Sequence, residues 1–188
     1  MEELKKAPVT VLLILANILV FTAVEFTGGS EDTMHMLQCG AAYTPAIMQG
    51  EYYRIFTSMF LHFGPQHLGN NMLVLFVLGG RLERTVGKLK YLLIYLLGGM
   101  GGNLLCLFLE LDSADFAVFA VMGAMIYAVI RGRGHIEDLS ARQVVIMAAF
   151  SLYFGFTSEG VDNAAHVGGL ICGFLLAVLL YHPSQRVG

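Results

Sequence analysis

The stretch His62-Phe63-Gly64-Pro65-Gln66-His67-Leu68-Gly69-Asn70-Asn71 places two histidines and two asparagines at the start of a long apolar run. A second stretch, Val161-Asp162-Asn163-Ala164-Ala165-His166-Val167-Gly168-Gly169-Leu170-Ile171-Cys172-Gly173, sets one more histidine into apolar, glycine-rich sequence. Ionisable rings are unfavourable in membrane segments, where they usually face a bundle interior or a water-filled cavity and have a function. Together the two stretches indicate a functional site inside a membrane protein.

The composition supports a membrane protein, since 56% of the 188 residues are hydrophobic and only 13% are charged. The length fits one compact domain. A net charge of −3 without a basic stripe gives no support for nucleic-acid binding. The three cysteines, Cys39, Cys106 and Cys172, are too widely spaced to suggest a disulfide framework or a zinc site. We therefore expect no metal, no cofactor and no nucleic-acid partner.

Six apolar segments predict an all-α bundle of six transmembrane helices. They fall at about 8–27, 56–79, 88–111, 116–130, 143–157 and 164–181. Some are shorter than the ~20 residues of a full helical crossing, but short segments can span inside a bundle. The first is too long for a signal peptide and reads as a retained helix. We expect an N-terminal helix and the start of an outer loop over 1–42, a core over 43–181 to which the 8–27 helix also belongs, and a short tail over 182–188.

Charge predicts the orientation of these six crossings. Ten of the eleven Lys and Arg residues fall on one side, and only Arg54 falls on the other. Because cytoplasmic loops are enriched in Lys and Arg, both termini are expected in the cytoplasm. The protein is expected to lie in the plasma membrane of a prokaryote. The outer loop, Gly28 to about Arg54, holds enough apolar residues to pack as a structured loop. Tyrosines near segment ends are expected to anchor the helices at the interface: Tyr52, Tyr53, Tyr91, Tyr95 and Tyr181.

His67 and Asn71 are four residues apart and therefore share one face of a helix. Such a pair can direct hydrogen-bond donors at a developing oxyanion. The alternative is that the two side chains bond to each other or to a backbone carbonyl. His62, near the start of this helix, is expected to hold the outer loop, and Asn70 is expected to have no chemical role.

The spacing of these residues resembles the rhomboid family of intramembrane serine proteases, in which a histidine, four residues, a second histidine, three residues and an asparagine recur. Gly50-Glu51-Tyr52-Tyr53-Arg54 is similar to the family's outer-loop motif, with tyrosine for tryptophan, and Gly79-Gly80-Arg81-Leu82-Glu83 looks like the end of its second helix. The resemblance implies that His166 is the general base and that His67 and Asn71 help form the oxyanion hole. It also implies transmembrane protein substrates or clients in a lipid bilayer, cleaved by a Ser–His dyad.

The family's nucleophile motif, Gly-x-Ser-Gly, is missing from this chain, whose serines stand at 30, 58, 113, 140, 151, 158 and 184. The nucleophile is expected near Asp115–Phe119. An ungapped comparison puts Asp115 in its place and Phe116 in the place of the following glycine. A deletion between the tandem Phe116-Ala117-Val118 and Phe119-Ala120-Val121 explains the loss in one step, and we favour it. Ser113 and Ser151 are the other conceivable nucleophiles.

A histidine base without a nucleophile cannot form an acyl-enzyme. We therefore expect a rhomboid-type intramembrane serine endopeptidase homologue that is inactive because its nucleophilic serine is missing. The alternative is a pseudoprotease that binds transmembrane clients without cleaving them. A transporter is disfavoured, because the sequence has no sign of charged, broken half-helices.

Overall fold

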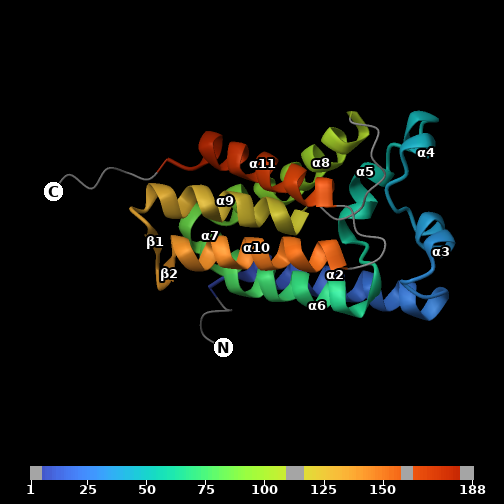
Figure 1. Ribbon diagram of the computed structural model, residues 1–188, viewed down its shortest axis with the longest axis horizontal. Helices are drawn as coiled ribbons and strands as arrows, with labels where there is room; N and C mark the ends of the chain where they lie inside the picture. The colour runs from blue at the N-terminus through green and yellow to red at the C-terminus, as the bar shows by residue number, and fades with distance from the viewer. Residues whose placement is uncertain (1–5, 109–116, 158–162, 183–188) are drawn as a thin grey trace.

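The computed structural model describes residues 6–108, 117–157 and 163–182, and nearly all of its regular structure is helical (Figure 1). The elements, in chain order, are α2 (Pro8–Thr27), α3 (Thr33–Gln38), α4 (Thr44–Met48), α5 (Arg54–Thr57), the 3-10 turn η1 (Ser58–Phe60), α6 (Gly64–Val74), the π-helical turn η2 (Leu75–Gly79), α7 (Gly80–Val86), α8 (Lys88–Phe108), α9 (Ala117–Arg131), β1 (His135–Ile136), β2 (Leu139–Ser140), α10 (Ala141–Thr157) and α11 (Asn163–Leu180).

The helix α9 forms the centre of a bundle with α8 and α11 beside it. Most of its residues are buried. Glycines make this close packing possible, because a Cβ at Gly123 would collide with the backbone carbonyl of Leu170 in α11, and one at Gly173 would collide with that of Ala120 in α9. Small residues at helix interfaces let backbones approach in this way. Figure 1 shows α3, α4 and α5 at one end of the bundle and the β1–β2 hairpin at the other.

The second helix expected from the sequence has different bounds in the structure. Instead of one helix over 56–79, the chain forms α5 and η1, leaves helical geometry, and begins a new helix at Gly64 that continues through η2 and α7 to Val86. Gly64 has φ +78°, which suits glycine, and Pro65 stands in the first turn, where its missing N–H is no loss. The new start puts His67 in the first turns of α6.

The segment expected to form the outer loop is structured, as its apolar content predicted. Met36 of α3 is fully buried and Ile47 of α4 is 3% exposed. Arg54 ties α5 to the segment that follows α3, since its Nη1 donates to the carbonyl oxygens of Leu37 at 2.7 Å and Ala41 at 2.9 Å. The same guanidinium forms an ion pair with Glu51 at 2.7 Å.

The prediction that tyrosines anchor the interface is wrong for two of them. Tyr91 and Tyr95 in α8 are fully buried and belong to the core, whereas Tyr52 and Tyr53 are exposed. Tyr95 accepts a hydrogen bond from the Asn17 side chain of α2 at 3.0 Å. Position near the end of an apolar run therefore does not separate an interfacial tyrosine from a buried one that faces a neighbouring helix.

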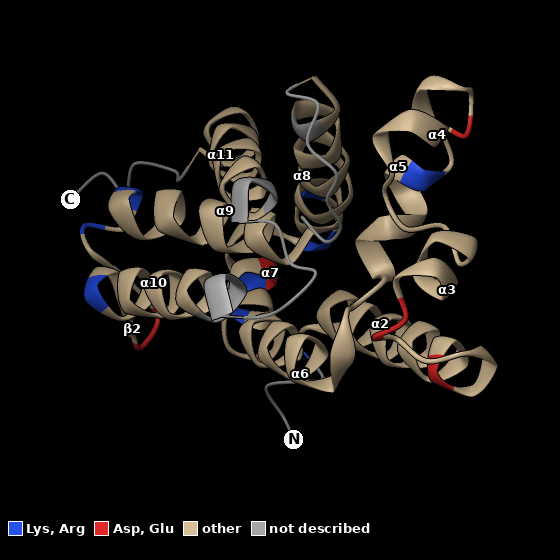
Figure 2. Ribbon diagram, turned by 45° about the vertical axis from the view of Figure 1, so that its right-hand side comes forward, with Lys and Arg blue, Asp and Glu red and all other residues tan. Residues whose placement is uncertain are grey.

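Among the described helices, α2 has the length and apolar composition of a membrane crossing, and α9, α10 and α11 are apolar but shorter. Charged residues divide between the ends of the bundle. Figure 2 shows acidic residues around α2–α4 and most of the basic ones toward α7, β2 and α10, where a few further acidic residues lie among them. This division follows the charge pattern of the sequence.

Candidate active site

The site begins on α6, where His67 and Asn71 lie one helical turn apart. His67 is 8% exposed and Asn71 is 1% exposed, so both polar side chains point into the bundle. The helix start at Gly64 places His67 in the first turn of α6 and Asn71 one turn later. His62, just ahead of this helix, is also buried, and its Nδ1 lies 3.3 Å from the carbonyl oxygen of Phe60.

His166 joins this group from the first turn of α11, about a hundred residues later in the chain. It is 1% exposed. Its ring centroid lies 5.9 Å from that of His67, and the His67 ring lies 5.4 Å from that of His62. The sequence motifs thus meet in space, with three imidazoles in a row and Asn71 one turn further along α6.

Phe119 covers one face of the His166 ring. The two ring centroids are 3.9 Å apart and the planes are only 13° from parallel. Stacking of this kind holds an imidazole in one orientation. Sequence reasoning did not single out this contact. Its only signal was the position of Phe119 at the end of the stretch where a nucleophile was expected.

That stretch, Asp115–Phe119, is only partly described. Ala117, Val118 and Phe119 form the start of α9 and are completely or almost completely buried, and none carries a hydroxyl. Asp115 and Phe116 lie outside the described residues. Within the part of α9 that can be seen, His166 therefore meets an aromatic ring and not a nucleophile.

The described serines have other surroundings. Ser30 donates to Glu25. Ser58 accepts from Asn103 at 3.0 Å, and Ser140 donates to Gln143 at 2.8 Å. Ser151 is 3% exposed on α10. Ser113, the other conceivable nucleophile, lies outside the described residues, as do Ser158 and Ser184.

The arrangement suits proton transfer and oxyanion binding. A buried imidazole can accept a proton from a substrate or from a nucleophile within hydrogen-bond reach. A second imidazole and an amide on an adjoining helix can donate to an oxyanion. Within residues 6–108, 117–157 and 163–182, no three His, Cys, Asp or Glu side chains are placed to hold a metal ion.

Comparisons with known proteins identify the family. The Rhomboid domain matches residues 49–183. The chain is 35% identical over 182 residues to the Rhomboid protease GluP of Bacillus subtilis (strain 168), covering 95% of this chain and 36% of that protein. It is 32% identical over 200 residues to the Rhomboid protease AarA of Providencia stuartii, covering 90% of this chain and 71% of that protein. It is 35% identical over 167 residues to the mitochondrial RHOMBOID-like protein 6 of Arabidopsis thaliana, covering 85% and 53%.

The chain thus spans about a third of GluP and about half of the Arabidopsis protein. The domain match covers well over half of the chain and includes His67, Asn71 and His166. The chain belongs to the rhomboid family of intramembrane serine proteases, which are integral membrane proteins.

Proposed function

We propose that this chain is a rhomboid-type endopeptidase homologue that lacks its nucleophilic serine and does not cleave substrates. The observation that carries the proposal is the stack of Phe119 on His166, at 3.9 Å between ring centroids, in a chain without Gly-x-Ser-Gly. The roles proposed for the site follow the family pattern. His166 is the base, and His67 and Asn71 are the oxyanion donors.

In an active site of this kind, the base takes the proton of a serine hydroxyl while the oxygen attacks the peptide carbonyl. The negative charge that develops on the carbonyl oxygen accepts hydrogen bonds from His67 and Asn71. The base then returns its proton to the leaving amine. Without the hydroxyl, the first bond cannot form, so the remaining groups can bind and polarise a peptide but cannot form an acyl-enzyme.

The finer architecture is part of the same proposal. We place six crossings in the membrane, with both termini in the cytoplasm of a prokaryote and Arg54 on the outer side. The core runs over 43–181, together with the helix at 8–27, and the substrates or clients are transmembrane proteins. The charge division between the ends of the bundle in Figure 2 supports this orientation.

A fluorophosphonate probe tests the missing nucleophile directly, because it labels only activated serines. We expect no labelling of the purified protein and no cleavage of a rhomboid reporter substrate above background. His166→Ala is the matched control. Labelling or cleavage that disappears in this variant would refute the proposal and indicate an unrecognised serine, with Ser113 the first to test.

A second candidate function is client binding without cleavage. It is favoured by the convergence of His62, His67 and His166, which persists although no serine motif is present. Photo-crosslinking from a position near Asn71 to a co-expressed transmembrane segment tests it. Specific crosslinks together with no cleavage support client binding. Crosslinks no stronger than those from a lipid-facing position such as Leu19, which is 68% exposed, would exclude it.

A further inference from the structure

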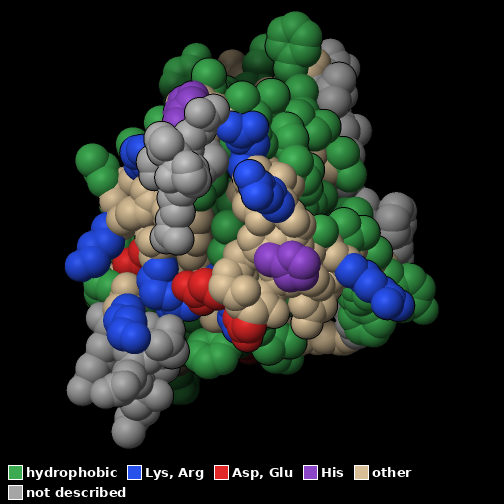
Figure 3. Space-filling model, turned by 90° about the vertical axis from the view of Figure 1, so that its left-hand side faces the viewer, with side chains coloured by type: hydrophobic (Ala, Val, Ile, Leu, Met, Phe, Trp, Pro, Cys, Tyr) green, Lys and Arg blue, Asp and Glu red, His purple; other side chains and the backbone are tan. Residues whose placement is uncertain are grey.

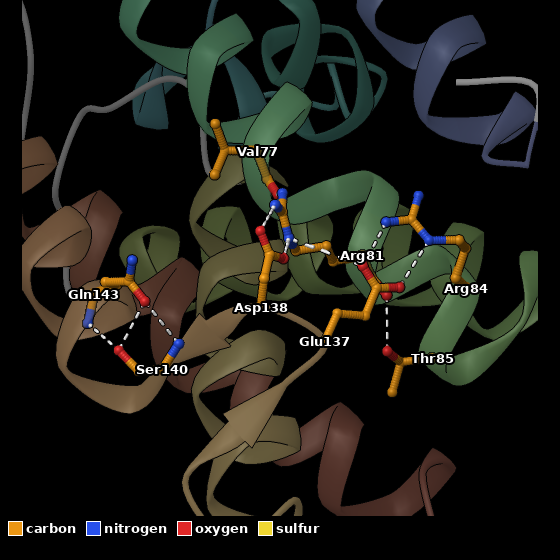
Figure 4. A network of polar contacts seen from close by, with 8 residues as sticks. All are labelled: Val77, Arg81, Arg84, Thr85, Glu137, Asp138, Ser140 and Gln143. Carbon is orange, nitrogen blue, oxygen red and sulfur yellow. Dashed lines mark hydrogen bonds and ion pairs between the residues drawn. The ribbon is translucent and has the colours of Figure 1, made fainter. Parts of the chain in front are cut away.

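The helix that carries the proposed oxyanion donors runs from α6 through η2 to the end of α7, and ion pairs fix its α7 end. Arg81 donates to both carboxylate oxygens of Asp138, each at 2.9 Å. Arg84 donates to both carboxylate oxygens of Glu137, at 2.8 and 2.7 Å. Figure 3 views this end of the bundle, where acidic side chains lie among basic ones, and Figure 4 shows the pairs. Because bidentate pairs have a fixed geometry, they tie this end of the helix to the turn between β1 and β2.

The other end of the same helix begins two residues after His62, and the η1 turn leads into it. The Leu61 N–H donates to the carbonyl oxygen of Ser58 at 3.1 Å, and His62 Nδ1 lies 3.3 Å from the carbonyl oxygen of Phe60. A carbonyl oxygen can only accept a hydrogen bond, so Nδ1 carries a proton, and in the neutral ring Nε2 is then the acceptor. The η1 turn therefore selects one tautomer of this imidazole.

Asn103 of α8 holds the η1 turn from a neighbouring helix. Its Nδ2 donates to the carbonyl oxygen of Ile55 at 2.7 Å and to Oγ of Ser58 at 3.0 Å. Ile55 belongs to α5, which ends two residues later, and carbonyl groups at a helix end need partners from outside the helix. Asn103 is 3% exposed and Ser58 is fully buried. Loss of these bonds would leave buried polar groups unpaired, which is costly.

Close packing acts on the η1 turn one helical turn earlier in α8. Gly99 precedes Asn103 by four residues and shares its face of the helix. A Cβ at Gly99 would meet Met59 Cε at 2.6 Å and Ala117 Cβ at 3.0 Å. The glycine therefore lets η1 and the start of α9 approach α8 closely. The amide bonds of Asn103 and this packing together fix the position of the turn.

The position of η1 matters for the site because His62 stands at one end of the row of imidazoles. Its ring centroid lies 5.4 Å from that of His67, with the planes 63° apart, and the His67 ring lies 5.9 Å from that of His166. All three rings are buried. A shift of the η1 turn would move the His62 ring and give the His67 ring room to turn.

We propose that Asn103 is a positioning residue for this site. By holding the η1 turn it fixes the tautomer and the place of His62, and the His62 ring in turn fixes the orientation of His67. The first step is independent of the proposed function, whereas the second rests on it, because it takes His67 as an oxyanion donor. Asn103 acts through Ile55 and Ser58, from a helix that carries none of the three histidines.

Asn17 of α2 offers a closely matched control. It is fully buried, and its Nδ2 donates to the carbonyl oxygen of Leu13 at 2.7 Å and to Oη of Tyr95 at 3.0 Å. It therefore makes the same two kinds of bond at the same lengths as Asn103, but neither partner belongs to η1. The control is a strict one, because the Tyr95 ring lies 6.2 Å from the ring of Phe60 in η1.

The test observes the histidine rings of the full chain by solid-state NMR, with isotope-labelled histidine and the protein reconstituted in bilayers. The signals lost in His62→Gln and His67→Gln assign the two rings. Three variants are compared with the wild type. Asn103→Leu removes both amide bonds, Ser58→Ala removes one of them, and Asn17→Leu is the control. Imidazole shifts distinguish the two tautomers, and thermal unfolding measures the stability of each variant.

We expect His62 of the wild type to carry its proton on Nδ1. Asn103→Leu should lower the ratio of the Nδ1-protonated to the Nε2-protonated ring about fivefold, the effect of losing one hydrogen bond, and should shift the His67 resonances. Ser58→Ala should act in the same direction with a smaller change. Asn17→Leu should lower the unfolding midpoint about as much as Asn103→Leu and leave both rings unchanged.

The proposal is overturned by a wild-type His62 that is protonated on Nε2, or by wild-type rings in Asn103→Leu. If Asn103→Leu does not fold, wild-type rings in Ser58→Ala overturn it instead. An equal shift in Asn17→Leu would mean general loosening of the bundle and would also overturn it, and a change at His62 with none at His67 would remove the second step. The NMR measurements do not depend on cleavage, so their outcome is distinct from that of fluorophosphonate labelling, which decides the proposed function.

Discussion

Glu83 is the residue whose loss should destabilise the bundle most clearly. It is only 1% exposed, and its carboxylate accepts hydrogen bonds from the Val9 N–H at 3.1 Å, the Thr10 N–H at 2.8 Å and the Thr10 hydroxyl at 2.8 Å. These are donors at the first turn of α2, where Ala7 provides no side-chain cap. A side chain more than seventy positions away in the sequence therefore caps this helix.

The loss of stability expected for Glu83→Ala follows from the hydrogen-bond donors that the substitution leaves without an acceptor. Each buried donor that loses its acceptor costs about 1–3 kcal/mol, and two backbone N–H groups are affected. Favourable interaction of a carboxylate with the start of a helix adds about 0.5–1 kcal/mol. Release of a buried charge offsets part of this. We expect a net loss of about 3 kcal/mol in the free energy of unfolding.

Unfolding in mixed micelles, followed by far-UV ellipticity during titration with dodecyl sulfate, measures this loss. The chain has no tryptophan, so fluorescence is less suitable. Thr10→Val is the matched control. It removes one hydroxyl bond and leaves the carboxylate bound to both N–H groups, so it should cost about 1 kcal/mol. If Glu83→Ala costs no more than Thr10→Val, the carboxylate does not cap α2 and the reasoning fails.

Three further outcomes are expected. In intact cells, a membrane-impermeant maleimide should label Asp32→Cys and not Gly87→Cys when each is made in a chain whose Cys39, Cys106 and Cys172 are replaced by alanine, and the reverse pattern would defeat the six-crossing topology. The hydrogen bond from Arg81 holds the pKa of Asp138 below its ordinary value. The ion pair of Asp138 with Arg81 therefore contributes to stability above the ordinary aspartate pKa. This contribution is lost as the pH falls through the lower pKa that Asp138 has in the folded protein. Asp138→Asn should lose less stability than the wild type between pH 7 and about 3. Gly123→Val should cost about 3 kcal/mol or more in dodecyl sulfate unfolding, because its Cβ meets a backbone carbonyl that cannot move aside.

The bounds of several helices could be predicted from hydrophobic runs alone. The apolar segment at 8–27 became α2 without a change of bounds, and the segments expected over 116–130 and 164–181 end within a residue of α9 and α11. Such hydrophobic runs are set by local composition, so they can be recognised from the sequence without knowledge of the packing. The break between η1 and α6 was missed, because Phe60–Phe63 is as apolar as the helix around it and only the Gly64-Pro65 pair marks the new start.

The candidate site was predictable in its members but not in its contacts. A histidine in an apolar stretch is conspicuous wherever it stands, so His67 and His166 could be selected without coordinates. The stack of Phe119 on His166 could not, since one phenylalanine among many carries no local signal and the contact depends on how α9 packs against α11. The roles of His67, Asn71 and His166 stay predictions until activity is measured.

The site geometry itself leads to a rescue experiment. Both explanations for the missing serine put the nucleophile four residues before Phe119, whether as Asp115 or within a lost segment. Four residues are about one helical turn, so a serine there would share the face of α9 whose aromatic ring stacks on His166. The packing that places this face, through Gly123 and Gly173, involves residues that neither change would alter.

We therefore expect that inserting Ser-Ala-Gly-Ala-Ser-Gly-Ala-Val between Val118 and Phe119 restores both fluorophosphonate labelling and cleavage of a reporter. If substitution caused the loss, Asp115→Ser with Phe116→Gly should suffice. The same insertion with its second serine replaced by alanine is the control, and removal of a nucleophile that acts with its base lowers turnover by about a million-fold in subtilisin. Restored cleavage must also vanish with His166→Ala. Activity that survives this change would show that the imidazole beneath Phe119 is not the base, and folded but inactive protein from both designs would show that more than the serine is missing.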